Sequence, residues 1–222
     1  MKATRFLCLL TGVCAASLAS SSLMAAVPVG SIALYSNGQV EKLISVDGDG
    51  FLWEDDRKRL YLRSANPVIP VLMRRNFLSG RGYRQTVVSG QPDSIQTLPA
   101  GTPVEFSVAR VKVGGERSRR SWKCVRSKTR TAKVMRLERR IDDYTCERFI
   151  IHRKFWYPVV KERREFSYSP DLGLVTKMKR TRGEKTTRWR LVKLIEPQKA
   201  SYTHVSRQVR NLRAPKQRQD GK

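Results

Sequence analysis

Short runs of alternating apolar and polar residues, separated by frequent turn residues, constrain the fold of this chain more than any other feature. In one such run Val104, Phe106 and Val108 point to one side of an extended chain, and Glu105 and Ser107 point to the other. About ten such segments, each bounded by Gly, Pro, Asn or Asp, indicate a mostly β domain. We therefore expect a single antiparallel sandwich or an open barrel.

The clearest expected hairpin lies near the start of this domain. Residues 40–46 and 51–53 flank the sequence Asp47-Gly48-Asp49-Gly50, which predicts two strands joined by an Asp-Gly turn. With the acidic residues at 54–56 this turn resembles a calcium loop in composition, but it lacks EF-hand spacing. The hairpin is the better interpretation, and no metal site is expected.

Residues 131–143 fit two structures. Val134, Leu137, Ile141 and Tyr144 have helical spacing, so a helix is one interpretation. The preferred interpretation is strand–turn–strand, with the turn at Asp142-Asp143.

The N-terminus has the order of a secretory signal peptide. Lys2 and Arg5 precede an uncharged apolar run over residues 6–19, and small residues follow. This order predicts that residues 1–26 are a signal peptide, cleaved at a site between 19 and 26. We therefore expect a periplasmic or extracellular protein, with a β-rich domain over 30–198. No second apolar run is long enough to span a membrane.

Two of the four cysteines, Cys8 and Cys14, leave with the signal peptide. Cys124 and Cys146 remain, and an even number in an oxidising compartment predicts a disulfide. Cys124 lies two residues after Trp122, and Cys146 lies two residues after Tyr144, so each cysteine shares a strand face with an aromatic residue. This predicts that the bridge faces inward. Closing this loop of 23 residues contributes about 3 kcal/mol by chain entropy.

The formal net charge is +26, and 24 of these charges belong to the chain after residue 26. Such a charge opposes compactness and implies anionic surroundings or an anionic partner. Between Arg110 and Arg164 there are 19 Lys and Arg against 6 Asp and Glu. We expect the basic runs there to form an anion-binding surface, in which Arg126, Lys128 and Arg130 make a ridge on one strand. The candidate residues are Arg117, Arg119, Arg120, Arg126, Lys128, Arg130, Lys161, Arg163 and Arg164.

The expected partner is an anionic envelope polymer or lipid headgroups. Nucleic acid presents similar charges, but the chain contains no recognised nucleic-acid motif. Residues 199–222 contain seven Lys and Arg and one acidic residue, which predicts a flexible, disordered basic tail.

Few residues suggest catalysis. His152 follows Cys146 by six positions, which admits a Cys-His nucleophile, but exported cysteines usually pair. We expect no catalytic residue and no cofactor. An envelope enzyme with a carboxylate or Cys-His site is the alternative. A small outer-membrane barrel is a third possibility, disfavoured because charges fall on both strand faces.

Several short motifs combine turn glycines, aromatic residues and paired cysteines. They are Tyr35-Ser36-Asn37-Gly38, Gly90-Gln91-Pro92-Asp93, Trp122-x-Cys124, Tyr144-Thr145-Cys146 and Tyr168-Ser169-Pro170. With these motifs the chain resembles, over residues 30–180, a group of exported Gram-negative bacterial proteins of unknown function. The resemblance implies a fold and an exported location and no catalytic residue. Together with the charge, it suggests a non-enzymatic β-domain that docks on an anionic surface or polymer.

Overall fold

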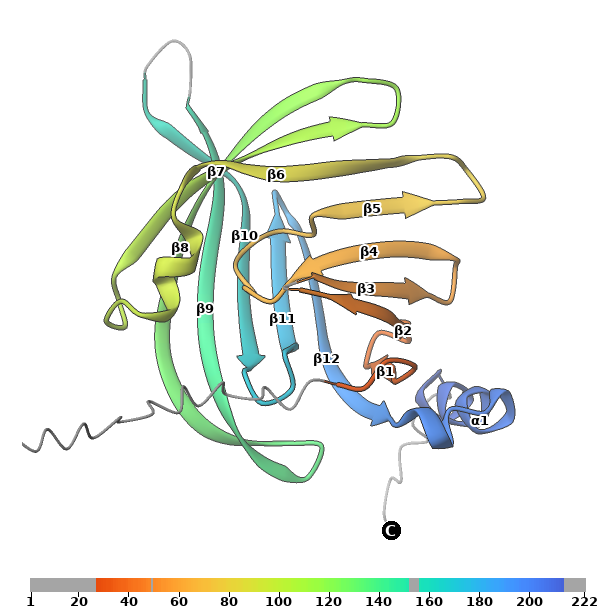
Figure 1. Ribbon diagram of the computed structural model, residues 1–222. Helices are drawn as coiled ribbons and strands as arrows, with labels where there is room; N and C mark the ends of the chain where they lie inside the picture. The colour runs from red at the N-terminus through yellow and green to blue at the C-terminus, as the bar shows by residue number, and fades with distance from the viewer. Residues whose placement is uncertain (1–26, 49, 152–155, 214–222) are drawn as a thin grey trace, which may run out of the picture.

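The computed structural model describes residues 27–48, 50–151 and 156–213. Within these ranges twelve antiparallel strands follow one another around a closed barrel, and β1 completes the ring against β12 (Figure 1). The strands are β1 (Ile32–Tyr35), β2 (Val40–Asp47), β3 (Gly50–Asp55), β4 (Arg59–Ser64), β5 (Met73–Asn76), β6 (Gly82–Gly90), β7 (Pro103–Lys112), β8 (Arg117–Val134), β9 (Leu137–Ile151), β10 (Pro158–Ser169), β11 (Leu174–Arg182) and β12 (Lys185–Ile195). The helical segments are η1 (Pro92–Gln96), η2 (Pro197–Lys199) and α1 (Tyr202–Arg213).

The short strand β1 closes the barrel. It pairs with β2 on one side and with β12 on the other, and all four of its residues are buried. Closure removes the unpaired strand edges that an open sheet would expose. The prediction of a mostly β, antiparallel domain is therefore confirmed, but the sheet is neither a sandwich nor an open barrel. Closure depends on a pairing between opposite ends of the domain, which strand patterns do not reveal.

Residues 131–143 are extended, so the helical interpretation is wrong. β8 and β9 are joined at Met135 and Arg136, which have φ values of 52° and 73°, while Val134 pairs with Leu137. Two successive left-handed residues are what a tight two-residue hairpin turn requires. The predicted turn at Asp142-Asp143 is also wrong, because both residues lie within β9.

The C-terminal segment differs from the predicted disordered tail. Residues 202–213 form α1, whose Val205, Val209 and Leu212 pack on the buried Ile32, Leu34 and Ile195. The three apolar residues recur at helical spacing and make a stripe that the many basic residues obscure in the sequence. Among the described residues, no helix combines the length and apolar character needed to cross a bilayer.

Two predicted features lie outside the described residues. They are the signal peptide, residues 1–26, and the last part of the predicted tail, residues 214–222.

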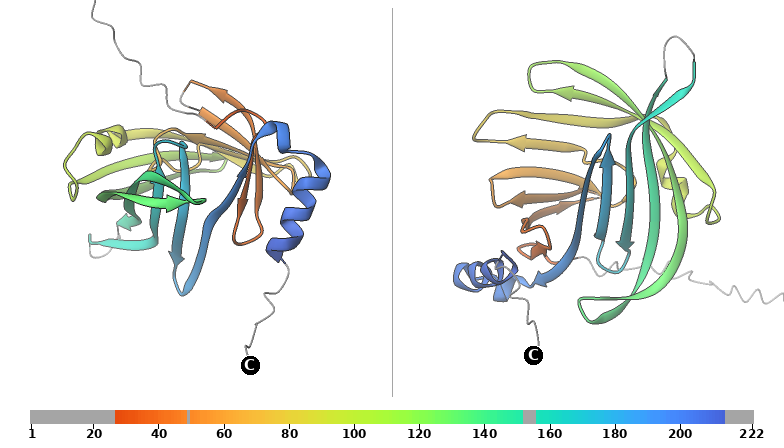
Figure 2. Two further views of the ribbon diagram at one scale, coloured as in Figure 1. Left: turned by 90° about the horizontal axis from the view of Figure 1, so that it is seen from below. Right: turned by 180° about the vertical axis from the view of Figure 1, so that it is seen from behind.

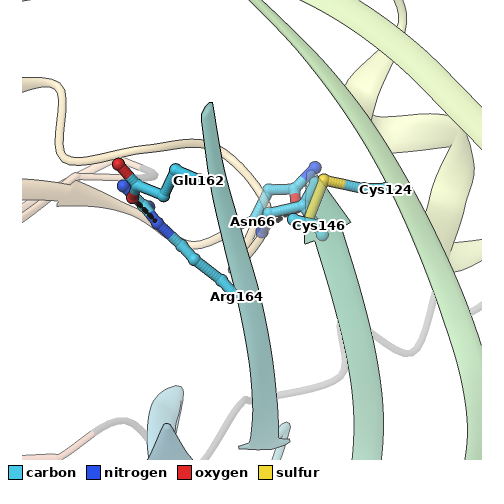
Figure 3. Close-up of a disulfide and its surroundings, with 6 residues drawn as sticks. Asn66, Cys124, Cys146, Glu162 and Arg164 are labelled. Carbon is cyan, nitrogen blue, oxygen red and sulfur yellow. Dashed lines mark hydrogen bonds and ion pairs between the residues drawn. A yellow bond between two sulfur atoms is a disulfide. The ribbon is translucent and has the colours of Figure 1, made fainter. Parts of the chain in front are cut away.

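The predicted disulfide is confirmed. Cys124 and Cys146 are directly opposite each other on β8 and β9, with a sulfur–sulfur distance of 2.06 Å and a Cα–Cα distance of 4.1 Å (Figure 3). Both cysteines are almost completely buried, in a core cluster with Trp122, Tyr144 and Phe166. The bridge therefore joins the two longest strands on their inward face.

Candidate functional site

The inside of the barrel carries many arginine side chains. Side chains alternate across a strand, so Arg120 and Trp122 on β8 face inward, while Arg119, the residue before Arg120, faces outward. The interior contains a cavity of about 500 Å³, which we call the arginine cavity. Its wall includes eight arginines and one acidic residue, Glu41. The arginines are Arg59, Arg63, Arg74, Arg110, Arg120, Arg164, Arg180 and Arg182.

A buried carboxylate lies beside this wall. Glu162 on β10 is 1% exposed, and Figure 3 shows it next to Arg164 on the same strand. Its Oε1 accepts hydrogen bonds from Nε of Arg164 at 2.7 Å and Nε of Arg180 at 2.8 Å. Its Oε2 accepts from Nη2 of Arg180 at 3.0 Å and Nη2 of Arg182 at 2.7 Å, and Nε of Arg148 lies 3.7 Å away. Four guanidinium groups therefore surround one carboxylate.

This environment keeps Glu162 ionised. Burial alone would raise the pKa of its carboxyl, but the guanidinium groups of Arg164, Arg180 and Arg182 outweigh burial and hold the pKa far below its usual range. Arginine remains protonated in proteins, so the four arginines and Glu162 carry a net positive charge at neutral pH.

The neighbouring arginines add to this surplus. In the described part of the chain, Arg74, Arg110 and Arg120 form no ion pair with a carboxylate, and the guanidinium carbon of Arg110 lies 3.5 Å from the ring centre of Tyr83. Burial lowers the pKa of Arg110 and of Arg120, and repulsion from nearby guanidinium groups lowers both further. We call the seven side chains the arginine cluster: Arg74, Arg110, Arg120, Arg148, Arg164, Arg180 and Arg182.

Several donors in this region lack acceptors. Nε of Arg110, Nε of Arg148 and the indole Nε1 of Trp122 are buried without a hydrogen-bond partner among the described residues. The guanidinium carbon of Arg164 lies 4.4 Å from the ring centre of Trp122, so cation and indole share one wall. Buried donors without acceptors are costly. An oxyanion in the cavity would supply both negative charge and acceptors.

The cavity wall formed by the early strands is, in contrast, electrically balanced. Arg63 donates to both oxygens of Glu41 at 2.8 and 2.6 Å, and Arg59 pairs with the buried Asp55. Within each pair the two charges cancel, so the surplus of positive charge lies on the side of the cavity formed by β5 to β11.

A second basic surface lies on the outside of the barrel, over β8 to β12. We call it the outer groove; its volume is about 820 Å³. Lys177 lies directly opposite Arg190, and Lys179 lies directly opposite Arg188. Like charges in directly opposed positions destabilise a sheet. The basic residues of the outer groove are Lys128, Arg130, Lys177, Lys179, Arg188 and Arg190.

The structure does not bring the predicted anion-binding residues onto one face. Arg120 and Arg164 line the arginine cavity, whereas Lys128 and Arg130 line the outer groove. The expected ridge is wrong because the register shifts between Arg126 and Lys128. Arg126 is consequently half-buried and donates to the carbonyl oxygen of Leu98 at 2.5 Å.

The other four predicted residues, Arg117, Arg119, Lys161 and Arg163, are exposed and belong to neither site. Arg119 donates to Oγ of Ser89 at 3.0 Å, and Arg163 pairs with Glu147 and Glu165. That these residues bind anions stays a prediction.

Sequence reasoning missed Glu162, Arg148, Arg180 and Arg182. A signal was present in strand parity: Glu162, Arg164, Phe166 and Tyr168 alternate along β10, and the last two belong to the core. Charged residues that continue the parity of a core face point into the barrel.

The structure argues against the Cys-His form of the enzyme alternative. Cys146 is bonded to Cys124, so it presents no thiolate, and His152 lies outside the described residues.

The acidic turn after β2 is a hairpin turn, as expected: Asp47 and Gly50 pair at the end of the β2–β3 hairpin. Among the described residues, no group of three or more His, Cys, Asp and Glu side chains is placed to hold a metal ion.

Comparisons with known proteins give little further information. No protein-family model matches the chain, and no curated protein matches it. Among solved structures, the chain is similar to the hypothetical lipoprotein YmcC from Escherichia coli K12, with a TM-score of 0.47 and 8% sequence identity. The similarity covers 75% of this chain and 86% of that chain.

Proposed function

We propose that this protein is an exported, non-enzymatic envelope protein whose barrel interior binds a ligand carrying phosphate, sulfate or carboxylate groups. The observation that carries the proposal is the arginine cluster: four of its seven guanidinium groups surround the buried carboxylate of Glu162, and six of the seven arginines line the cavity. Arg110, Arg120, Arg148 and Arg164 are partly shielded from solvent. Partly desolvated positive charge without matching negative charge is costly to the fold, and an anionic ligand offsets that cost.

The chemistry of the wall favours oxyanions. Guanidinium groups offer paired, planar donors that match the oxygens of phosphate and carboxylate groups. The buried donors of Arg110 and Trp122 add positions where a ligand oxygen gains a hydrogen bond. A cavity of about 500 Å³ is within the range of ordinary small-ligand sites.

The same geometry argues for binding without turnover. A general acid or base works best when its pKa lies near the working pH, and the arginines hold the pKa of Glu162 far below neutrality. The carboxylate instead orients the arginines, and this fixed arrangement favours recognition.

Export is supported by the N-terminal residues 1–26, which have the order of a signal peptide, and by the disulfide, which is typical of oxidising compartments. An envelope location would place the barrel among anionic lipid headgroups and polymers, the partners expected from its charge.

The test uses two adjacent arginines on β8. R120Q removes a side chain from the arginine cavity, while R119Q removes the same charge from the outside of the barrel. With pyrophosphate as the probe, calorimetry should show saturable binding that R120Q weakens at least about tenfold, because one charge-assisted hydrogen bond contributes about 1.5–3 kcal/mol. R119Q should bind as the wild type does. Equal affinities for R119Q and R120Q, or no saturable binding to the wild type, would contradict the proposal.

A second candidate function is docking of an anionic polymer in the outer groove. The directly opposed pair Lys177–Arg190 favours it, because an anionic chain would relieve the repulsion between these two side chains. In the second opposed pair, Lys179–Arg188, Glu165 already pairs with Lys179. Residues Lys128 and Arg130, from the predicted docking surface, line the same groove.

Elution from a phosphocellulose column tests this second site. K177Q/R190Q should elute at lower salt than the wild type, because each lost phosphate contact reduces counterion release. R117Q/K161Q removes two exposed charges outside the groove and is the matched control. If both double variants elute together, the groove has no special role and only net charge matters.

A further inference from the structure

Exposed apolar side chains lie at the tips of three hairpins that share one end of the barrel. Of the fifteen large apolar residues that are exposed in the described ranges, nine lie at the β5–β6, β7–β8 and β9–β10 tips. In an up-and-down barrel these three turns lie at the same end, and Figures 1 and 2 show the β5–β6 and β7–β8 hairpins reaching outward on the same side of the barrel. The nine residues are Phe77, Leu78, Val111, Val113, Ile150, Ile151, Trp156, Tyr157 and Val160.

The first two tips lie side by side. Val113 donates its backbone N–H to the carbonyl oxygen of Gly82, and Gly82 pairs with Arg75, so the β7–β8 tip lies beside the β5–β6 tip. Leu78 is 82% exposed and Val113 is 64% exposed. We call Phe77, Leu78, Val111 and Val113 the tip patch. Exposed apolar residues that gather in this way mark an interaction surface.

Positive charges frame the tip patch. The guanidinium carbon of Arg75 lies 5.1 Å from the ring centre of Phe77, and Arg81, Arg84 and Lys112 are exposed nearby. Val111, Val113 and Met73 line a hollow of about 300 Å³ together with Arg75, Arg84 and Lys112. Among the described residues, the one acidic side chain that pairs with these cations is Glu116, which lies 2.6 Å from Nζ of Lys112.

We propose that the tip patch anchors the protein on the surface of an anionic lipid bilayer. Apolar side chains on projecting turns can enter the boundary between headgroups and acyl chains, while flanking Arg and Lys remain among the phosphates. An anionic leaflet attracts each such cation. This inference does not depend on ligand binding in the arginine cavity, since the tip patch lies on hairpin ends and outer faces.

Vesicle sedimentation of the purified chain tests the proposal. The wild type should bind vesicles of phosphatidylglycerol and phosphatidylcholine in equal parts, and should bind phosphatidylcholine vesicles at least about tenfold more weakly, because its cations are attracted to the anionic surface. F77S/L78S should lose at least about tenfold in affinity for the mixed vesicles through its lost apolar burial. I44S/V46S removes two exposed apolar residues from β2, far along the chain from these tips, and should bind as the wild type does.

Two further measurements keep the result specific. F77S/L78S should unfold at the wild-type temperature and bind pyrophosphate normally, whereas R120Q should bind vesicles normally. Equal vesicle binding by F77S/L78S and the wild type would overturn the anchor, as would equal binding to both vesicle types. Self-association of the wild type that F77S/L78S abolishes, without vesicle binding, would identify a second copy of the chain as the occupant and also overturn it.

Discussion

Replacing Glu162 with Gln is expected to lower the free energy of unfolding by about 3–5 kcal/mol, because it removes a buried charge and leaves the mostly buried Arg148 and Arg164 without their carboxylate. Glu162 is the shared acceptor of Arg164, Arg180 and Arg182. The amide of Gln carries no charge, and its NH2 group offers donors to side chains that need acceptors. Urea unfolding at low ionic strength measures the loss.

The control is E165Q on the same strand. Glu165 is 37% exposed and pairs with Arg163 and Lys179, so E165Q should change the free energy of unfolding by less than about 1 kcal/mol. Sulfate should recover more stability in E162Q than in E165Q, because an anion that enters the cavity replaces the lost charge. Similar losses in the two variants would show that Glu162 does not hold the cluster together.

The free energy of unfolding of the wild type should fall as the pH falls into the acid range. The pKa of Glu162 is lower in the folded chain than in the unfolded chain, so its contribution is fully present above the ordinary pKa of about 4.3. That contribution is lost as the pH falls toward the folded-state value. E162Q should therefore show a weaker decline in stability below about pH 4 than the wild type does.

Removing the disulfide is the second large effect. C124A/C146A should lose about 3 kcal/mol from the entropy of the unfolded chain, with a further cost because the two sulfur atoms fill a buried position between core aromatic residues. Urea unfolding of the double variant, and of the wild type with and without reductant, measures the effect. Reduction of the wild type should reproduce most of the loss. A change below about 1 kcal/mol in either experiment would contradict this prediction.

The parts of the fold that depend on local pattern were predictable from the sequence. Alternation and turn residues predicted the β2–β3 hairpin, and parity predicted that Cys124 and Cys146 face inward as a bridge. The turn at Met135-Arg136 was not predictable, because neither residue favours the left-handed region and the Asp pair further along offers the stronger turn chemistry. Helix α1 was not predicted, because its basic residues are typical of a disordered tail, although its apolar residues recur at helical spacing.

The candidate site was harder to predict because it depends on contacts between distant strands. A basic run indicates an exposed surface, since an exposed charge is the usual case. Arg120 and Arg164 belong to two such runs, but both side chains line the cavity inside the barrel. The register shift near Arg126 reverses the sides of its neighbours, and no residue type in the sequence indicates that shift. Parity relative to core aromatic residues is the local clue that separates inward from outward arginines.

The meeting of β1 and β12 has a consequence for how the chain reaches its native state. Ile32 pairs with Ile195, so nearly the whole domain must be available before the ring can close. Contacts between such distant residues form late, because the intervening chain must first lose its conformational entropy. The hairpins from β2 to β12 can form earlier from local pairings. Docking of α1 onto Ile32, Leu34 and Ile195 then covers the junction, so truncation after residue 195 should accelerate opening of the ring while the central hairpins remain intact.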